Sequence, residues 1–146
     1  MKTKRNYFAL IIFALFTVFC MVMIFMFSFQ SGEASAGVSV SFYDIFIEYT
    51  GFDFISHDAF RKLAHFSEFA ALGFGFCGTV YFYKTKLKII FPLILSVLYA
   101  VSDEIHQLFV PERACRVLDI VVDSIGSLCG IGVFCLLIII FKQIKR

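Results

Sequence analysis

The chain contains 146 residues, of which 60% are hydrophobic and 16% are charged, and its formal net charge is +2. This composition is too apolar for an ordinary soluble domain, so it indicates an integral membrane protein that forms one compact unit. The small net charge does not indicate a nucleic-acid partner. None of the five cysteines forms a CxxC pair, so we expect small core residues rather than a disulfide framework or a cysteine zinc site.

The first predicted element is an apolar run over residues 8–29, which follows the basic residues Lys2, Lys4 and Arg5. A helix of this length spans the roughly 30 Å hydrocarbon core of a bilayer. The basic start and the small residues 34–36 also resemble a cleavable signal peptide. The apolar run is longer than the usual hydrophobic region of about 7–15 residues, so we expect a retained transmembrane helix.

Residues 30–59 form an acidic segment that contains no lysine or arginine. Within it, Phe42, Phe46 and Tyr49 follow one another at helical spacing, which is typical of a short amphipathic helix on the membrane surface. The serine-rich first part is polar and typical of turns. An ordinary ordered extracytoplasmic loop explains the segment nearly as well as the helix does. Both interpretations therefore stay open.

Three further apolar runs predict transmembrane helices over residues 60–83, 89–110 and 117–141. The N-terminus, the loop 84–88 and the C-terminus carry nine of the 13 Lys and Arg residues and none of the 11 acidic residues. The positive-inside rule therefore predicts that both termini are cytoplasmic. The expected fold class is all-α: a polytopic membrane protein in which residues 1–146 form a single domain, a bundle of four transmembrane helices.

Polar side chains on the last three predicted helices fall at one level, in the outer leaflet. At 1.5 Å per residue, His65 lies ~7 Å below the outer boundary, and Asp103 and Asp123 lie ~9 Å below it. Helical spacing places these side chains on three coherent faces, which carry Arg61, His65 and Glu68; Asp103, His106 and Gln107; and Asp119 and Asp123. The last face continues into Gly126 and Gly130, a pattern that allows close helix approach, so we expect this face to look into the bundle.

The acidic residues at this level cannot all be ionised in one apolar site without partners. The available cations are Arg61, Lys62, Arg113 and Arg116. The cluster is either a structural salt-bridge network or a pocket that faces the outer leaflet. We favour the pocket, because ionisable residues inside a membrane usually mark functional sites. Its candidate ligand-binding residues are Arg61, His65, Glu68, Asp103, Glu104, His106, Gln107, Arg113, Asp119 and Asp123.

Four pieces of the sequence resemble the VanZ-like family of small bacterial membrane proteins, and the resemblance covers residues 30 to about 135. They are Gln30-Ser31-xxx-Ser35, Arg61-Lys62-xx-His65-Phe66-x-Glu68-Phe69, Asp103-Glu104-x-His106-Gln107-x-Phe109-x-Pro111-x-Arg113 and Asp119-xxx-Asp123-xx-Gly126-xxx-Gly130. The Asp-Glu-x-His-Gln block is quite specific. Two positions depart from the family pattern: Glu112 replaces the usual glycine, and Phe69 replaces the common tyrosine and lacks its hydroxyl group.

The resemblance implies a multi-pass protein of the bacterial cell membrane with a role in the envelope. The family is named for a protein that gives low-level resistance to teicoplanin, a glycopeptide that carries an acyl chain and acts at the outer membrane face. We therefore expect envelope maintenance or teicoplanin-type resistance through binding of a membrane lipid or a lipidated amphiphile. In this interpretation Arg61 and Arg113 meet its phosphate or carboxylate, and the carboxylates position them or meet an amine. An amphiphile-binding membrane protein of this kind is also compatible with the formation of homo-oligomers.

Two other classes of function stay open. One is an intramembrane enzyme that acts on a lipid-linked or cell-wall substrate, in which His65 with Glu68, and Glu104 with His106, form acid–base pairs. A metal-dependent version would use His65, Glu68, Asp103, His106 and Asp123. The sequence contains no HExxH, GxSxG or P-loop motif, and we expect no metal and no other cofactor. The other class is a transporter or partner subunit that relays protons, although no internal repeat is visible.

Overall fold

The computed structural model describes residues 6–29, 32–51, 56–83, 89–111, 113 and 115–144. These residues form five helices and no strands: α1 (Tyr7–Ser28), α2 (Gly32–Thr50), α3 (His57–Tyr83), α4 (Ile90–Gln107) and α5 (Val117–Ile144). The all-α prediction is confirmed, and the bounds of α1, α3, α4 and α5 lie within three residues of the predicted spans. Several residues used in the sequence analysis lie outside the described part: the basic residues at 2–5, 84–88 and 145–146, and Gln30, Ser31 and Glu112.

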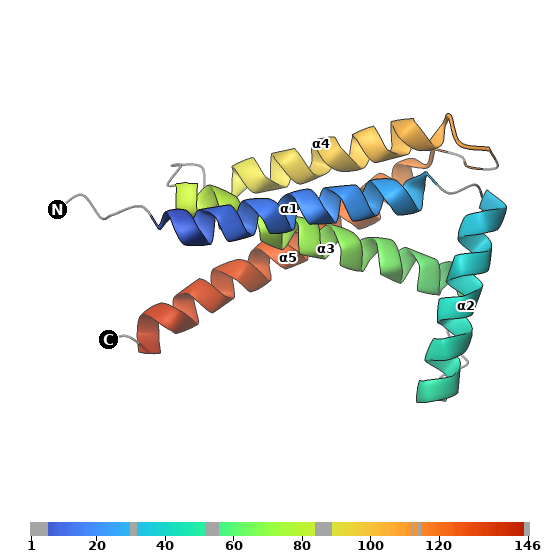
Figure 1. Cartoon of the computed structure of the whole chain (residues 1–146), viewed down its shortest axis with the longest axis horizontal. Helices are drawn as coiled ribbons and strands as arrows, with labels where there is room; N and C mark the ends of the chain where they lie inside the picture. The colour runs from blue at the N-terminus through green and yellow to red at the C-terminus, as the bar shows by residue number, and fades with distance from the viewer. Residues whose placement is uncertain are drawn as a thin grey trace.

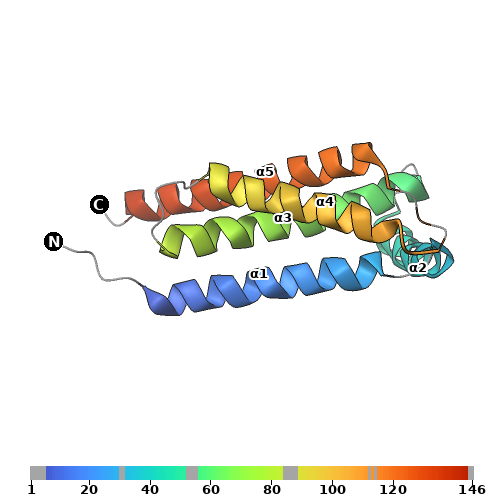
Figure 2. The same ribbon diagram turned by 90° about the horizontal axis from the view of Figure 1, so that it is seen from above.

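Helices α1, α3, α4 and α5 form a bundle, and α2 lies across one end of it (Figures 1 and 2). At the end opposite α2, α1 and α4 begin and α3 and α5 end, so consecutive helices of the bundle run antiparallel. The last turns of α1 and α4 and the first turns of α3 and α5 consequently meet near α2. These turns carry the polar residues that the sequence analysis placed at one level.

The most extensive helix contact joins α3 and α5. It depends on glycine, because a Cβ added at Gly126 would collide with the carbonyl oxygen of Phe66, and one at Gly130 with that of Ala70. Next to them, the hydroxyl of Ser127 donates a 3.2 Å hydrogen bond to the carbonyl oxygen of Phe69. The prediction that the Gly126–Gly130 face looks into the bundle is therefore confirmed.

Helices α1 and α5 are long and apolar enough to cross a membrane. Only 17% of the most apolar part of α1 and 28% of that of α5 is buried inside the protein. A core helix of a soluble protein would be mostly buried, whereas these helices expose large apolar side chains such as Leu15 and Leu136. Among the described helices, α3 and α4 are less apolar, because each carries charged residues in the half nearest α2. Two helices thus support a membrane protein, while four spans and cytoplasmic termini stay predictions.

The segment 30–59 contains a helix of 19 residues, α2, which is longer than the predicted short helix. The alternative of an ordered loop is therefore wrong for residues 32–50, which are helical. The rings of Tyr43 and Phe46 lie 5.6 and 5.5 Å from the ring of Phe60, so α2 packs on the first turn of α3. Gly51 ends α2 with a positive φ of 69°, a backbone conformation that glycine adopts without strain.

The expectation that the cysteines are core residues holds only in part. Cys20 and Cys77 are buried, and Cys135 is half-buried. Cys115 and Cys129 are exposed, so the expectation is wrong for these two. Cys115 precedes α5, and Cys129 lies within α5, and the exposed position of both removes the packing reason for a small residue.

Candidate functional site

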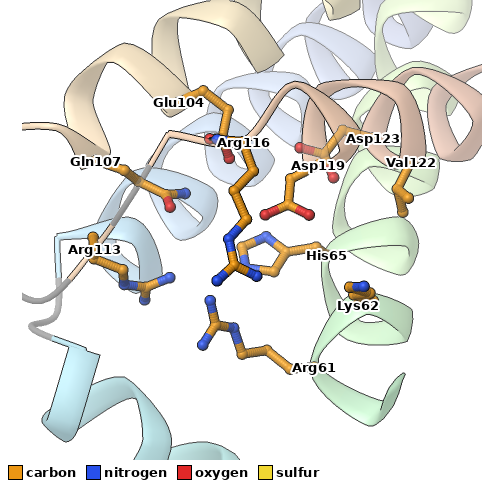
Figure 3. Close-up of a pocket in the computed structure, with 10 residues that line it drawn as sticks. All are labelled: Arg61, Lys62, His65, Glu104, Gln107, Arg113, Arg116, Asp119, Val122 and Asp123. Carbon is orange, nitrogen blue, oxygen red and sulfur yellow. Dashed lines mark hydrogen bonds between the residues drawn. The ribbon is translucent and has the colours of Figure 1, made fainter. Parts of the chain in front are cut away.

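A polar cavity of about 210 Å³ lies between α3, α4, α5 and the segment that joins α4 to α5 (Figure 3). Seven of the ten predicted site residues form its wall, together with three others. The wall consists of Arg61, Lys62, His65, Glu104, Gln107, Arg113, Arg116, Asp119, Val122 and Asp123. We refer to this cavity as the polar pocket.

Helical periodicity explains why α3 and α5 each contribute several of these residues. Arg61 and His65 lie one turn apart on α3, and Asp119 and Asp123 lie one turn apart on α5, so each pair projects from one face. Asp119 also occupies the first turn of α5, where the partial positive charge of the helix N-terminus stabilises a carboxylate. The two helices therefore present a basic and an acidic face to the same space.

Hydrogen bonds fix the segment between α4 and α5 over the pocket. The buried Glu104 side chain accepts a 2.7 Å hydrogen bond from the backbone N–H of Arg116. The Nη2 group of Arg113 donates a 3.3 Å hydrogen bond to the carbonyl oxygen of Phe27, near the end of α1. These contacts hold both arginines where their guanidinium groups reach the pocket.

The guanidinium groups of Arg61, Arg113 and Arg116 point toward one another in the pocket (Figure 3). Burial lowers the pKa of Arg113 from its ordinary value, and the nearby positive charge of Arg61 lowers it further, against the opposing effect of the surrounding carboxylates. Among the described residues, no ion pair joins Arg61 or Arg116 to a carboxylate. Converging like charges repel, so an anion placed between them would be favourable.

The acidic side of the pocket is more deeply buried than the basic side. Asp123 is 1% exposed and Glu104 is 2% exposed, whereas Lys62 and Arg116 are exposed. Glu104 has its backbone partner, but Oδ1 of Asp123 has no hydrogen-bond partner among the described residues. The polar pocket thus has an exposed basic rim and a buried acidic interior.

Three predicted site residues do not line the pocket. Asp103 accepts hydrogen bonds of 2.8 Å from Ser28 and 3.1 Å from Gln107, and it faces α1. His106 stacks on Phe25 of α1, with ring centroids 4.7 Å apart. Glu68 contacts a residue of the wall, with its Oε2 3.7 Å from Nδ1 of His65.

Three residues of the pocket wall were not among the predicted site residues: Lys62, Arg116 and Val122. Lys62 and Arg116 had been considered only as partners of the carboxylates. A signal existed for Arg116, because it immediately precedes the predicted fourth helix and therefore enters the bundle beside Asp119. Ser28 ends an apolar run 75 residues away from its partner Asp103, and no pattern in the sequence links the two.

The arrangement bears on the metal-dependent and acid–base alternatives that the sequence left open. Among the described residues, no group of three or more His, Cys, Asp or Glu side chains is placed to hold a metal ion. The predicted pair of Glu104 and His106 is not formed, because Glu104 binds the Arg116 backbone and His106 stacks on α1. The pair of His65 and Glu68 is close enough for an ionic contact.

A comparison with known protein families places the chain in a family. The family model described as VanZ/LLP1 matches residues 13–140, a range that includes every residue of the polar pocket. No curated protein and no solved structure matches the chain.

Proposed function

The chain belongs to the VanZ/LLP1 family, and we propose that it is a four-span membrane protein whose polar pocket binds the headgroup of an amphiphile in the outer leaflet. The observation that carries this proposal is the convergence of three guanidinium groups, those of Arg61, Arg113 and Arg116, on one cavity (Figure 3). A guanidinium group binds phosphate or carboxylate through two parallel hydrogen bonds. Three of them in one cavity favour an anionic group as the ligand.

In this proposal α1, α3, α4 and α5 all cross the membrane, and α2 lies along its outer surface. The shortest of the four, α4, has 18 residues and is ~27 Å long at 1.5 Å per residue, which is close to the ~30 Å of a hydrocarbon core. The end of the bundle opposite α2 adjoins the lysine-rich loop 84–88 in sequence, so the positive-inside rule makes it cytoplasmic. The polar pocket then lies near the outer membrane surface.

The size of the cavity decides which part of an amphiphile can enter it. A volume of about 210 Å³ exceeds the need of a single water molecule, roughly 10–15 Å³, many times over, but it cannot enclose acyl chains or a whole glycopeptide. The apolar part of the ligand therefore stays in the bilayer, beside the exposed apolar side chains of the bundle. Binding in the outer leaflet fits a role in envelope maintenance or in low-level resistance to an acylated glycopeptide such as teicoplanin.

A growth-inhibition assay in a sensitive Gram-positive host tests this role. It compares the wild type with Arg61→Gln and Arg113→Gln at matched membrane expression, against teicoplanin and a glycopeptide without an acyl chain. We expect the wild type to protect against teicoplanin selectively and both variants to lose protection. Lys142→Gln, which changes a charge on α5 far from the pocket, should protect like the wild type. Protection that survives both arginine substitutions would refute a binding role for the pocket.

The contact between His65 and Glu68 supports a second candidate, an intramembrane enzyme that modifies or hydrolyses a lipid-linked or cell-wall substrate. The two side chains are 3.7 Å apart, and His65 reaches the pocket, so the pair could transfer a proton to or from a bound headgroup. Incubating the purified protein with lipid-linked cell-wall precursors and following product formation tests this candidate. Turnover that is lost in Glu68→Gln would support it over simple binding.

A further inference from the structure

We infer that the polar pocket selects a zwitterionic headgroup, with a phosphate held by Arg61, Arg113 and Arg116 and a primary ammonium group held by Asp123. This inference rests on the proposed binding function and adds the class of ligand. Phosphoethanolamine, the headgroup of phosphatidylethanolamine, has this chemistry.

The carboxylate of Asp123 provides the first observation. Its side chain is 1% exposed, it lines the pocket, and its Oδ1 has no hydrogen-bond partner among the described residues. Figure 3 shows the carboxylate directed into the space between α4 and α5. A buried carboxylate oxygen that accepts no hydrogen bond is energetically unfavourable. A ligand that donates a hydrogen bond to this oxygen removes that cost and therefore binds more tightly.

Three polar side chains near Asp123 in the sequence or on the pocket wall, those of Ser124, Ser127 and Gln107, make hydrogen bonds elsewhere. The hydroxyl of Ser127 binds the carbonyl oxygen of Phe69, and that of Ser124 binds the carbonyl oxygen of Ile120. The Nε2 group of Gln107 donates to Asp103. Asp103 and Glu104 accept hydrogen bonds within the protein, and this sets Asp123 apart from the other two buried acidic residues in the described part of the chain.

The order of the charges from the rim to the interior provides the second observation. The basic side chains include the exposed Lys62 and Arg116, whereas Asp123 is buried. In phosphatidylethanolamine the phosphate joins the lipid and the ammonium group is terminal. If the lipid tail stays in the bilayer, the phosphate therefore binds the arginine side chains near the rim, and the terminal ammonium group extends further in and reaches Asp123. A primary ammonium group combines a positive charge with three hydrogen-bond donors. A choline headgroup has the charge but no donor, and a glycerol headgroup has hydroxyl donors but no positive charge.

Calorimetric titration of the purified full chain in a maltoside detergent tests the inference. The probes are short-chain phosphatidylethanolamine, phosphatidylglycerol and phosphatidylcholine, which share the phosphate and differ in the group beyond it. We expect the wild type to bind the ethanolamine lipid about tenfold more tightly than the other two, the effect of one charge-assisted hydrogen bond. Asp123→Asn should lose this preference and still bind the glycerol lipid, whereas Asp123→Glu should keep part of it.

The controls separate the inference from the proposed function. Lys142→Gln, which removes a charge on α5 far from the pocket, should keep the preference, and Arg113→Gln should weaken binding of all three lipids. Helix content and thermal unfolding in detergent show whether each variant is folded. Equal wild-type affinity for the three lipids, or a preference that survives in folded Asp123→Asn, would overturn the inference and leave headgroup binding in place. If no lipid binds the wild type, the proposed function itself fails.

Discussion

The hydroxyl of Ser28, the last residue of α1, donates a 2.8 Å hydrogen bond to Oδ2 of Asp103 on α4, and both side chains are buried. Gln107 donates to the same oxygen at 3.1 Å. Helix α1 packs mainly on α3, and its smaller contact with α4 also includes the stacking of His106 on Phe25. Asp103 therefore joins two helices, and Gln107 extends this junction to the wall of the polar pocket.

We predict that Ser28→Ala destabilises the protein by roughly 1–3 kcal/mol, because a buried carboxylate loses one of its two donors. Thermal unfolding in detergent, followed by loss of helix content, measures the effect. Ser102→Ala is the matched control: its hydroxyl is exposed and binds the carbonyl oxygen of Tyr99 in its own helix at 2.7 Å, so its effect should stay within about 0.5 kcal/mol. Equal effects of the two substitutions would show that the α1–α4 junction contributes little.

The helices of the bundle could be predicted because apolar runs of sufficient length have few alternatives in a membrane protein. Helical spacing also identified the faces of α3 and α5 that form the pocket. On α4 the same reasoning placed Asp103, His106 and Gln107 on one face, which is correct, but it assigned the whole face to the pocket. Spacing fixes the angle between side chains on one helix and does not fix which neighbour lies opposite. In the structure α1 occupies that side, so Asp103 and His106 face α1.

The segment between α4 and α5 was predicted only in part: Arg113 was expected in the pocket and lines it, and Arg116 lines it without having been expected there. Arg113 and Arg116 have no periodic pattern around them, and their positions depend on hydrogen bonds to Phe27 and Glu104 that join distant parts of the chain. Similarly, the sequence of α2 is compatible with both a helix and a loop. Its packing on Phe60 is a tertiary contact, and its own sequence gives only a weak amphipathic signal.

The glycines at the α3–α5 contact give the second prediction. Gly130→Ala should destabilise the bundle by about 1–3 kcal/mol or more, because the new Cβ would overlap the carbonyl oxygen of Ala70 and force the helices apart. Gly132→Ala, two residues along the same helix, has nothing within 4 Å of the new Cβ and should be close to neutral. Comparing the thermal unfolding of the two variants in detergent measures the difference. If Gly130→Ala lowers the stability no more than Gly132→Ala does, α3 and α5 are not in close contact at this position.

The aromatic contact of His106 gives the third prediction. Its ring stacks on Phe25 and Phe29, with centroids 4.7 and 6.0 Å apart, and does not line the pocket. His106→Phe should therefore keep both the fold and headgroup binding. His106→Ala should lower the unfolding free energy by about 1–3 kcal/mol through loss of the stack and the cavity that remains. Lipid titration of the two folded variants shows whether His106 takes part in headgroup binding. Loss of binding in His106→Phe would show that the imidazole contacts the ligand.

The exposed cysteines allow a test of the proposed orientation. Cys115 lies in the segment between α4 and α5, at the end of the bundle near α2, and is exposed. If this end faces outward, a membrane-impermeant maleimide should label Cys115 in intact cells that express a variant with no other cysteine. Labelling of Cys115 only after the cells are permeabilised would reverse the orientation and place the polar pocket on the cytoplasmic side.

Cys129 provides the control, because it is exposed in the structure but lies in the middle of α5. If α5 crosses the membrane, lipid covers this thiol, and a polar maleimide should label it neither in intact nor in permeabilised cells. Labelling should appear after denaturation, which shows that the thiol itself is intact. Introducing a cysteine at Ile144, at the far end of α5, completes the test: this position should react only after permeabilisation. Reaction at all three positions in intact cells would contradict a membrane-spanning α5, since only water-exposed thiols react with a polar reagent.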